Sequence, residues 1–375
     1  MKNDSFYSQV LNELAAKNIR RALKPNGTGI NFVHNDYLGL KNHPEIAEAA
    51  ALAYRKWGSG SGGSRLLGGN PEIFERAETE LARWKGTEAA LLFNCGYSAN
   101  VGLVSALCNE QTTLFMDKLN HASIVDGYRQ SNAKLVRFPH HDTDFLETAL
   151  KKTSGRKIIY VESVYSMDGD LAPLRDYADL AEKSSALLVV DEAHGEGIFG
   201  PDGKGLVHEL GLENRVDLVL GTFGKAYGTA GACVWGSRTL IDYLVNKARS
   251  FIYSTALPPG VVASMLKAVE VAVRESWRRE RALTLAAAFR EKMNRNGWNT
   301  LKSASQIVPL VIGSSEKCIS VSEKLSEKGL WTAAVREPTV PAGTARLRIN
   351  FTASHQEKDL EMLVSALESW RTEHE

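Results

Sequence analysis

Two stretches indicate the fold most clearly: ALLVVDEAH (186–194) and DLVLGTFGKAYG (217–228). Each begins with apolar residues and ends in reactive side chains, which are Asp191 and His194 in the first and Thr222 and Lys225 in the second. Strands that are apolar on both faces and alternate with helices are typical of a parallel or mixed sheet covered by helices. We therefore predict an α/β protein. Further apolar runs of this kind are EAALLF (88–93), TTLFMD (112–117), KLVRFP (134–139), KIIYVES (157–163) and GACVWG (231–236).

The chain has 375 residues, and at roughly 150 residues per domain this length favours two domains over one. Apolar spacing predicts an N-terminal helix over 5–24 and a long connecting helix over 259–297. From about residue 300 the pattern changes to strand, helix, strand, helix, which indicates a smaller α+β domain. We expect an N-terminal helical arm with a small-domain segment (1–45), a large domain (46–290) and a small C-terminal domain (291–375).

Composition excludes several classes of protein. The 45 Lys and Arg nearly balance the 44 Asp and Glu, leaving a net charge of +1, whereas nucleic-acid binders carry a basic excess. The four cysteines stand far apart, which argues against a disulfide framework and against a cysteine zinc site. The first residues lack the apolar stretch of a signal peptide, and no apolar run approaches the ~18 residues of a membrane span. We expect a cytoplasmic protein that binds neither nucleic acid nor membrane.

Two glycine patterns suggest a nicotinamide dinucleotide site, and both lack the required context. GSGSGG (58–63) follows a helix where a strand is needed, and GEGIFG (195–200) runs into Pro201 instead of opening a helix. An NAD-dependent oxidoreductase is therefore a remote alternative. Asp191 and His194 suggest a metal, but no partner histidines support one, and we expect no metal site.

Pyridoxal phosphate (PLP) accounts for the same residues better. This cofactor needs a lysine for a Schiff base, a carboxylate at the pyridine nitrogen, a side chain stacked on the ring and a phosphate cup. Lys225 lies in a glycine-flanked loop, and Asp191 ends an apolar strand where a low dielectric strengthens charge pairing. His121 is a candidate for the stacked ring. Gly96 and Tyr97 begin a helix, whose N–H groups suit a phosphate.

Over nearly its whole length, from about residue 5 to 370, the chain resembles the α-oxoamine synthases, which are fold-type-I PLP enzymes with an aspartate-aminotransferase-like fold. The resemblance implies a mixed or parallel sheet in a large PLP-binding domain, a smaller C-terminal α+β domain, and a homodimer with a shared active site. It is carried by motifs in a fixed order: NDYLGL, GSGGSRLLGGN, NCGYSAN, NHAS, SMDGD, DEAHGEG, TFGKAYG, YSTALPP and PTVPAGTARLR.

The resemblance also implies a role for each site residue. Lys225 is expected to form the Schiff base, with Asp191 at the pyridine nitrogen and His121 stacked on the ring as the other catalytic residues. Arg348, helped by Asn35, is the expected clamp for the amino-acid carboxylate, since a guanidinium fork suits that task. The remaining positions match contacts to the cofactor (Gly96, Tyr97, Ser166, Thr222, and His194 at the phenolic oxygen), to the phosphate of the neighbouring subunit (Ser254 or Thr255) and to the acyl substrate (Arg21, Thr339).

Three loop motifs resemble most the biotin-pathway branch of the family, which condenses L-alanine with pimeloyl-CoA or a pimeloyl carrier protein and releases CO2 and the free thiol. The alternatives within the family are 2-amino-3-ketobutyrate CoA ligase, which uses glycine and acetyl-CoA, 5-aminolevulinate synthase and serine palmitoyltransferase. Two questions stay open from the sequence. Either Arg20 or Arg21 could face the site, and Arg65 either shapes the amino-acid pocket or braces the glycine-rich loop.

Overall fold

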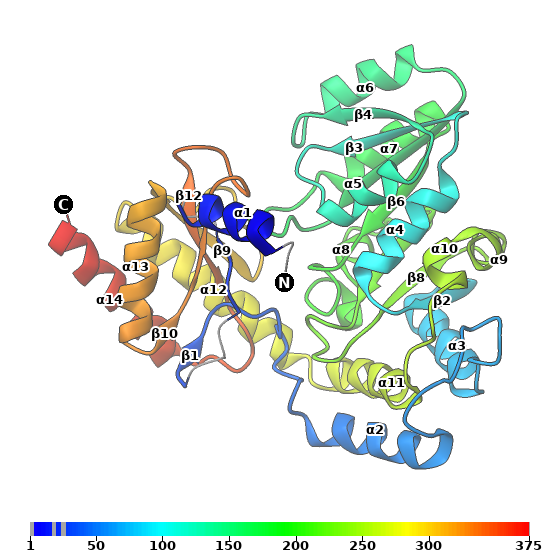
Figure 1. Cartoon of the computed structure of the whole chain (residues 1–375), viewed down its shortest axis with the longest axis horizontal. Coiled ribbons are helices and arrows are strands. Elements are labelled where there is room, and N and C mark those ends of the chain that lie inside the picture. Colours follow the sequence, from blue (N-terminus) through cyan, green and yellow to red (C-terminus); the bar gives the residue numbers. More distant parts are fainter. Residues whose placement is uncertain (1–3, 17–19, 24–27, 375) are drawn as a thin grey trace.

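The computed structural model describes residues 4–16, 20–23 and 28–374 (Figure 1). Its largest element is a seven-stranded sheet in the order β2-β8-β7-β6-β5-β3-β4. β4, β3, β5, β6 and β7 are parallel, and β8 runs antiparallel to both β7 and β2. The mixed sheet expected from the sequence is therefore confirmed. The strands are β2 (Ala89–Phe93), β3 (Thr112–Asp117), β4 (Lys134–Phe138), β5 (Arg156–Glu162), β6 (Leu187–Asp191), β7 (Leu218–Thr222) and β8 (Ala232–Gly236).

Helices cover both faces of this sheet. Alternate residues along a strand enter two different apolar cores: Ile159 and Val161 of β5 join one, and Ile158 and Tyr160 join the other. Since successive side chains of a strand point to opposite faces, this explains why the strands are apolar throughout. The first core is closed by α2 (Pro44–Trp57), α3 (Ile73–Lys85), α6 (Thr143–Lys152), α7 (Leu174–Ser184) and α11 (Pro259–Arg274), and the second by α4 (Gly96–Leu107), α5 (Ala122–Arg129), α9 (Arg238–Lys247) and α10 (Arg249–Ile252). A 3-10 turn, η1 (Pro201–Gly203), and α8 (Leu206–Glu209) connect β6 to β7.

A separate apolar core lies beside this body, around a three-stranded antiparallel sheet in the order β11-β12-β9. Phe32, from the N-terminal part of the chain, is fully buried in it. The short strand β1 pairs in parallel with β10, which joins residues 30–31 to the C-terminal part. The elements here are β1 (Ile30–Asn31), α12 (Trp277–Arg295), β9 (Ile307–Gly313), α13 (Ser315–Glu327), β10 (Leu330–Trp331), β11 (Ala333–Val335), β12 (Ala345–Asn350) and α14 (Glu357–His374).

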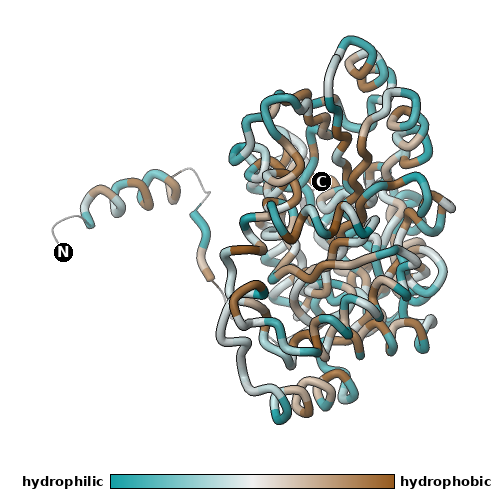
Figure 2. The backbone as a smooth tube through the Cα atoms, turned by 90° about the vertical axis from the view of Figure 1, so that its right-hand side faces the viewer, coloured by the Kyte–Doolittle hydropathy of each residue, from teal (hydrophilic) through white to brown (hydrophobic). Residues whose placement is uncertain are grey.

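Two predicted helices differ from the structure. The N-terminal helix α1 spans Asp4–Ala16 with no buried residue, and residues 20–23 are irregular, so the predicted extent of 5–24 is wrong. Figure 2 shows α1 projecting from the main body of the molecule. The predicted helix over 259–297 is two helices, because the backbone leaves the helical region at Glu275 (φ −108°, ψ 57°). α11 packs in the core of the large sheet and α12 mainly in the C-terminal core, so the break lies where the chain passes between cores.

None of the helices in the described part of the chain is both long enough and apolar enough to cross a membrane.

Candidate active site

A cavity of about 310 Å³ opens at the carboxyl ends of the parallel strands. It is lined by the residues that end β5, β6 and β7, which are Glu162, Asp191 and Thr222, and by Lys225 and His121 from the connections that follow strands. Ligands of open α/β sheets bind at this edge. The two strand ends singled out in the sequence, with Asp191 and His194 and with Thr222 and Lys225, thus supply side chains to one edge.

Lys225 is joined to a chain of hydrogen-bonding groups. Its Nζ lies 2.9 Å from Nε2 of His194, and Nδ1 of His194 lies 2.7 Å from the hydroxyl of Tyr37. The Tyr37 hydroxyl donates to Oδ1 of Asn35 at 3.0 Å, so it can accept the Nδ1 proton of His194 and leave Nε2 to accept from Lys225.

Burial controls the charges along this chain. It lowers the pKa of Lys225 to about 8, although the carboxylates of Asp191 and Glu162 act in the opposite direction. Burial and the positive charge of Lys225 hold the pKa of His194 well below its usual value, so the imidazole is neutral. A lysine with this pKa supplies free amine near neutral pH, which a nucleophile or a general base requires.

Asp191 is oriented by two donors, Nδ2 of Asn100 and the main-chain N–H of Ala193, both at 2.8 Å. It is 4% exposed, and a buried carboxylate that receives two hydrogen bonds is well placed to pair with a cationic ring nitrogen. His121 caps the N-terminus of α5, and its Nδ1 lies 2.7 Å from the Ser123 hydroxyl. That contact fixes the imidazole beside the cavity that Asp191 also lines.

The N-terminus of α4 forms a cradle beside Thr222. A Cβ added to Gly96 would lie 2.6 Å from Cγ2 of Thr222, so only glycine fits this close approach. The Thr222 hydroxyl oxygen is buried and has no hydrogen-bond partner among the described residues. A buried, unpaired hydroxyl on a side chain beside a helix N-terminus suits a phosphate. The donors and the carboxylate present therefore fit PLP.

The cavity lining includes one of the three remaining residues expected at the phosphate, Tyr97, and leaves out Ser254 and Thr255. Tyr97 lines the cavity, and its hydroxyl donates to Asp126. The Thr255 carbonyl accepts from Nδ2 of Asn94 at 2.8 Å. Neither Ser254 nor Thr255 lines the Lys225 cavity of its own chain, so their contact with a phosphate across a subunit interface stays a prediction.

Arg348 and Asn35 lie together at the Tyr37 end of the hydrogen-bonded series Lys225–His194–Tyr37. Both terminal nitrogens of Arg348 donate to Oδ1 of Asn35, at 3.2 and 3.1 Å, and its Nε donates to the Ser166 carbonyl at 2.6 Å. Ser166 therefore lies against Arg348 and outside the lining of the Lys225 cavity. Arg348 also lies 3.5 Å from the Tyr37 hydroxyl, which joins it to the His194 chain.

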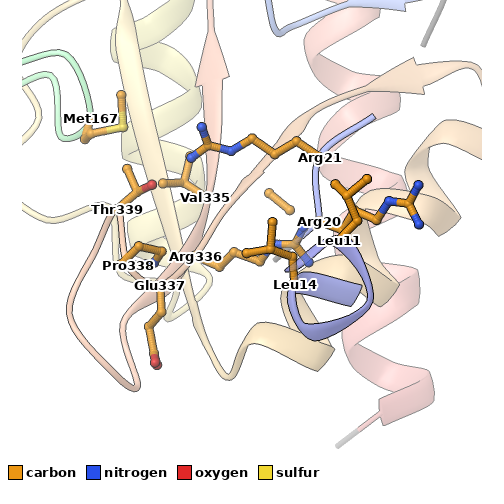
Figure 3. Close-up of a pocket in the computed structure, with 11 residues that line it drawn as sticks. Leu11, Leu14, Arg20, Arg21, Met167, Val335, Arg336, Glu337, Pro338 and Thr339 are labelled. Atoms are coloured by element: carbon orange, nitrogen blue, oxygen red, sulfur yellow. The ribbon is translucent and has the colours of Figure 1, made fainter. Parts of the chain in front are cut away.

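Arg21 and Thr339 line a second cavity, of about 720 Å³, between the N-terminal segment and the β11–β12 connection. Figure 3 shows the Arg21 side chain extending across it toward Thr339 and Met167. Arg20 also lines this cavity. The sequence left open whether Arg20 or Arg21 faces the site, and both do. The rest of the lining is mostly apolar, with one further cation, Arg336, and one carboxylate, Glu337; the apolar residues include Leu11, Leu14, Val335 and Pro338.

Arg65 braces the glycine-rich loop. Its two terminal nitrogens donate to both carboxylate oxygens of Glu78 at 2.8 Å, and its guanidinium lies over the ring of Phe74. Arg65 does not line the Lys225 cavity, and the bracing interpretation is the one that the contacts favour.

His140 ties together two loops beside the site. Its Nδ1 lies 3.0 Å from Asp117, and its Nε2 lies 2.7 Å from Asp170. These carboxylates raise the pKa of His140 to about 9 against the opposing effect of burial, so it is charged at neutral pH. Asp117, His140 and His141 are close enough to hold a metal ion, but both ring nitrogens of His140 already face carboxylates.

Sequence reasoning missed Tyr37, Asn100 and Glu162. Tyr37 and Asn100 stand inside quoted motifs, NDYLGL and NCGYSAN, without having been singled out. Asn100 carried a signal, because it is a polar residue in a helix that is otherwise largely apolar, and it is 3% exposed. Glu162 carried a weaker one, as a charged residue at the end of an apolar strand.

Comparison with known proteins gives a consistent family. Residues 28–367 match the model of the family "Aminotransferase class I and II". The chain is 46% identical over 341 residues to a putative 8-amino-7-oxononanoate synthase of Geobacillus kaustophilus, covering 90% of this chain and 87% of that protein. It is 44% identical over 361 residues to the 8-amino-7-oxononanoate synthase of Geobacter metallireducens, covering 95% and 92%.

Solved structures agree with this result. A serine palmitoyltransferase from S. paucimobilis with bound PLP superposes with a TM-score of 0.91 at 30% identity, covering 98% of this chain and 97% of that one. An 8-amino-7-oxononanoate synthase from Francisella tularensis superposes with a TM-score of 0.79 at 27% identity, covering 92% and 97%. The chain therefore belongs to the class I and II aminotransferase family of PLP-dependent enzymes, and within it to the α-oxoamine synthase branch of 8-amino-7-oxononanoate synthases.

Proposed function

We propose that this protein condenses L-alanine with a pimeloyl thioester, carried by CoA or by a carrier protein, to give 8-amino-7-oxononanoate, CO2 and the free thiol in biotin biosynthesis. The relatives named above support this reaction. Likeness of fold does not choose among substrates, since the serine palmitoyltransferase superposes with a higher TM-score than the synthase does. The choice rests on sequence identity and on the acyl cavity.

The 720 Å³ cavity is the observation in the structure that favours a long, anionic acyl substrate. Leu11, Leu14 and Pro338 give it apolar surface (Figure 3). Its charged lining residues are three arginines, Arg20, Arg21 and Arg336, and one carboxylate, Glu337, so positive charge predominates. An apolar chain that ends in a carboxylate matches this lining, whereas an acetyl group would leave most of it unused. The cavity adjoins the reaction site, because its Met167 directly follows Ser166, whose carbonyl accepts from Arg348.

Arg348 and Asn35 would bind the alanine carboxylate. Arg348 is 7% exposed, and its guanidinium is held by Asn35 and by the Ser166 carbonyl, so its remaining donor capacity is preorganised for a planar anion. The hydroxyl of Tyr37 joins this clamp to His194 and Lys225. The amino acid is thereby placed with its Cα near the Lys225 amine.

PLP, when bound at Lys225, supplies the electron sink for the electrons released from Cα–H and from the carboxylate. Asp191 would hold the pyridine nitrogen protonated, His121 would cover one face of the ring, and His194 would lie at the phenolic oxygen. Gly96, Tyr97 and Thr222 would hold the phosphate. The Lys225 amine would take the α-proton of alanine and return a proton to the product after CO2 leaves, so that one base serves both steps.

We also propose that the enzyme is a cytoplasmic homodimer. All four cysteines are free, which fits a reducing compartment. The loop residues Leu67 (81% exposed) and Tyr253 (71% exposed) are apolar and unusually exposed, and a bridge between Ser64 and Thr255 joins their segments. Helix α1 presents a further apolar group, Phe6, Tyr7, Val10 and Leu11, to solvent (Figure 2). A second copy of the chain would cover such surfaces, and light scattering of the purified protein tests the dimer.

The reaction is tested with purified protein, PLP, L-alanine and pimeloyl-CoA, followed by mass spectrometry of the aminoketone and by release of free thiol. Wild type is expected to form 8-amino-7-oxononanoate, and Lys225→Ala is expected to form none while keeping its fold by circular dichroism. Near-normal turnover by Lys225→Ala would exclude the assigned role of the lysine. Preference for glycine with acetyl-CoA would transfer the assignment to the ligase branch of the family.

A further inference from the structure

Glu162 is a buried carboxyl group for which the mechanism above has no use. It ends β5 and is the direct register partner of Asp191, which ends β6. Its side chain is 3% exposed and lines the Lys225 cavity. Its Oε1 accepts the main-chain N–H of His121 at 2.5 Å. Glu162 therefore touches the residue whose ring is expected to cover the cofactor.

Two buried carboxyl groups on neighbouring strands share one cavity, and like charges in such a site do not both ionise readily. Asp191 has the better support as the anion, because Asn100 and Ala193 both donate to it. Glu162 has one main-chain donor from His121. The proton of the pair therefore resides on Glu162.

The charged groups around Glu162 also favour a proton on Glu162 and a negative charge on Asp191. Burial first, and then the negative charge of Asp191, raise the pKa of Glu162 to about 8, and Asp117 adds a smaller effect in the same direction. The N–H of His121 and the positive charge of Lys225 lower this pKa, and each is weaker than burial or Asp191. A protonated carboxyl still offers its carbonyl oxygen as an acceptor, so the contact with His121 does not require the charge.

We propose that Glu162 is a positioning residue: as a neutral carboxylic acid it holds the main chain of His121, and thereby its imidazole, in place over the cofactor while Asp191 keeps the negative charge. This inference rests on the proposed function for the role of His121. It deepens that function by assigning to Glu162 the task of fixing the ring face on which the reaction proceeds.

The test compares Glu162→Gln with Glu162→Ala. Glutamine keeps a neutral acceptor of the same length, whereas alanine leaves the buried N–H of His121 without a hydrogen-bond partner. Loss of this hydrogen bond should lower both cofactor affinity and kcat about tenfold. The readouts are the visible circular dichroism of the bound PLP, the affinity of the apoprotein for PLP from tryptophan fluorescence, and kcat and KM for alanine. We expect Glu162→Ala to change the dichroism and lower affinity and kcat, and Glu162→Gln to restore all three at pH 7.

Glu192→Gln is the matched control. Glu192 is also fully buried near the same sheet edge, but it accepts from Ser163, Leu206 and Val207 and does not line the cavity. This variant should lose stability without a change in the dichroism of PLP. Unchanged dichroism and affinity in Glu162→Ala, or a Glu162→Gln as impaired as Glu162→Ala at pH 7, would overturn the proposal.

A second measurement needs neither cofactor nor turnover. A carboxyl group whose pKa is raised in the fold destabilises the folded state as pH increases between its unfolded and folded values. The urea midpoint of apo Glu162→Gln should therefore rise relative to wild type between pH 5 and pH 9. Parallel curves for the two proteins would refute a neutral Glu162. Since neither this comparison nor the PLP affinity depends on the substrates, failure of the proposed reaction would be seen separately, as absent product from the wild type.

Discussion

The lowered pKa of Lys225 can be measured on the apoprotein. Burial in the sheet-edge cavity lowers this pKa from 10.5 to about 8. At pH 7 about a tenth of the lysine is then free amine, roughly 300 times more than at the ordinary value, because the difference is about 2.5 units. Cyanate is small enough for a 310 Å³ cavity, and it carbamylates an amine only in its unprotonated form. The assay treats the apoprotein with cyanate from pH 6 to 11 and quantifies carbamylated Lys225 by peptide mass spectrometry.

We expect the labelling rate of Lys225 to reach half its maximum near pH 8 in the folded protein, and above pH 10 in the same chain unfolded in guanidinium, which is the internal control. Asp191→Asn removes a carboxylate that raises the lysine pKa, so it should move the folded midpoint to lower pH. A folded midpoint that coincides with the unfolded one would show that burial does not activate the lysine. A midpoint that rises in Asp191→Asn would refute the electrostatic account.

Three further outcomes are expected. Arg348→Lys replaces the planar guanidinium group by a point charge, so KM for alanine should rise about 10- to 100-fold with a smaller change in kcat. An unchanged KM would show that Arg348 does not bind the alanine carboxylate. Tyr37→Phe breaks the link between His194 and the clamp and should lower kcat about tenfold in steady-state assays, while unaltered kinetics would make the hydroxyl dispensable. His140 has a raised pKa, so its pairing stabilises the fold below about pH 6.5 and is lost as pH rises through 9. In urea titrations, His140→Asn should be less stable than wild type by up to about 3 kcal/mol near pH 6, with the difference closing by pH 10. A pH-independent difference would contradict that charge.

Much of the fold follows from local sequence pattern. Strands such as 157–163 and 186–191 are apolar on both faces, which only a sheet covered on both sides accommodates. Polar residues that directly follow such strands must meet at one edge when the strands are parallel, and Asp191 and Thr222 do so. The break at Glu275 was not visible in the pattern, because α11 and α12 are each apolar on one side and only their partners differ.

The contacts that complete the site depend on tertiary structure. Tyr37 reaches His194 across 157 positions of sequence, and nothing local to NDYLGL sets that distance. Asn100 and Glu162 matter through their relation to Asp191, which exists only after β6 lies between β5 and β7 and packs against α4. Roles taken from the family resemblance predict which residues gather, but the partner of each residue comes from the packing.

The central claim is that the cavities at Lys225 and at Arg21 together select alanine and a pimeloyl thioester. The most direct measurement offers the purified protein, with PLP, an equimolar mixture of L-alanine, glycine, pimeloyl-CoA and acetyl-CoA, and identifies the aminoketones by mass spectrometry. 8-Amino-7-oxononanoate is expected as the dominant product, with its share reduced in Arg21→Ala. A dominant product built from glycine and acetyl-CoA would contradict the account.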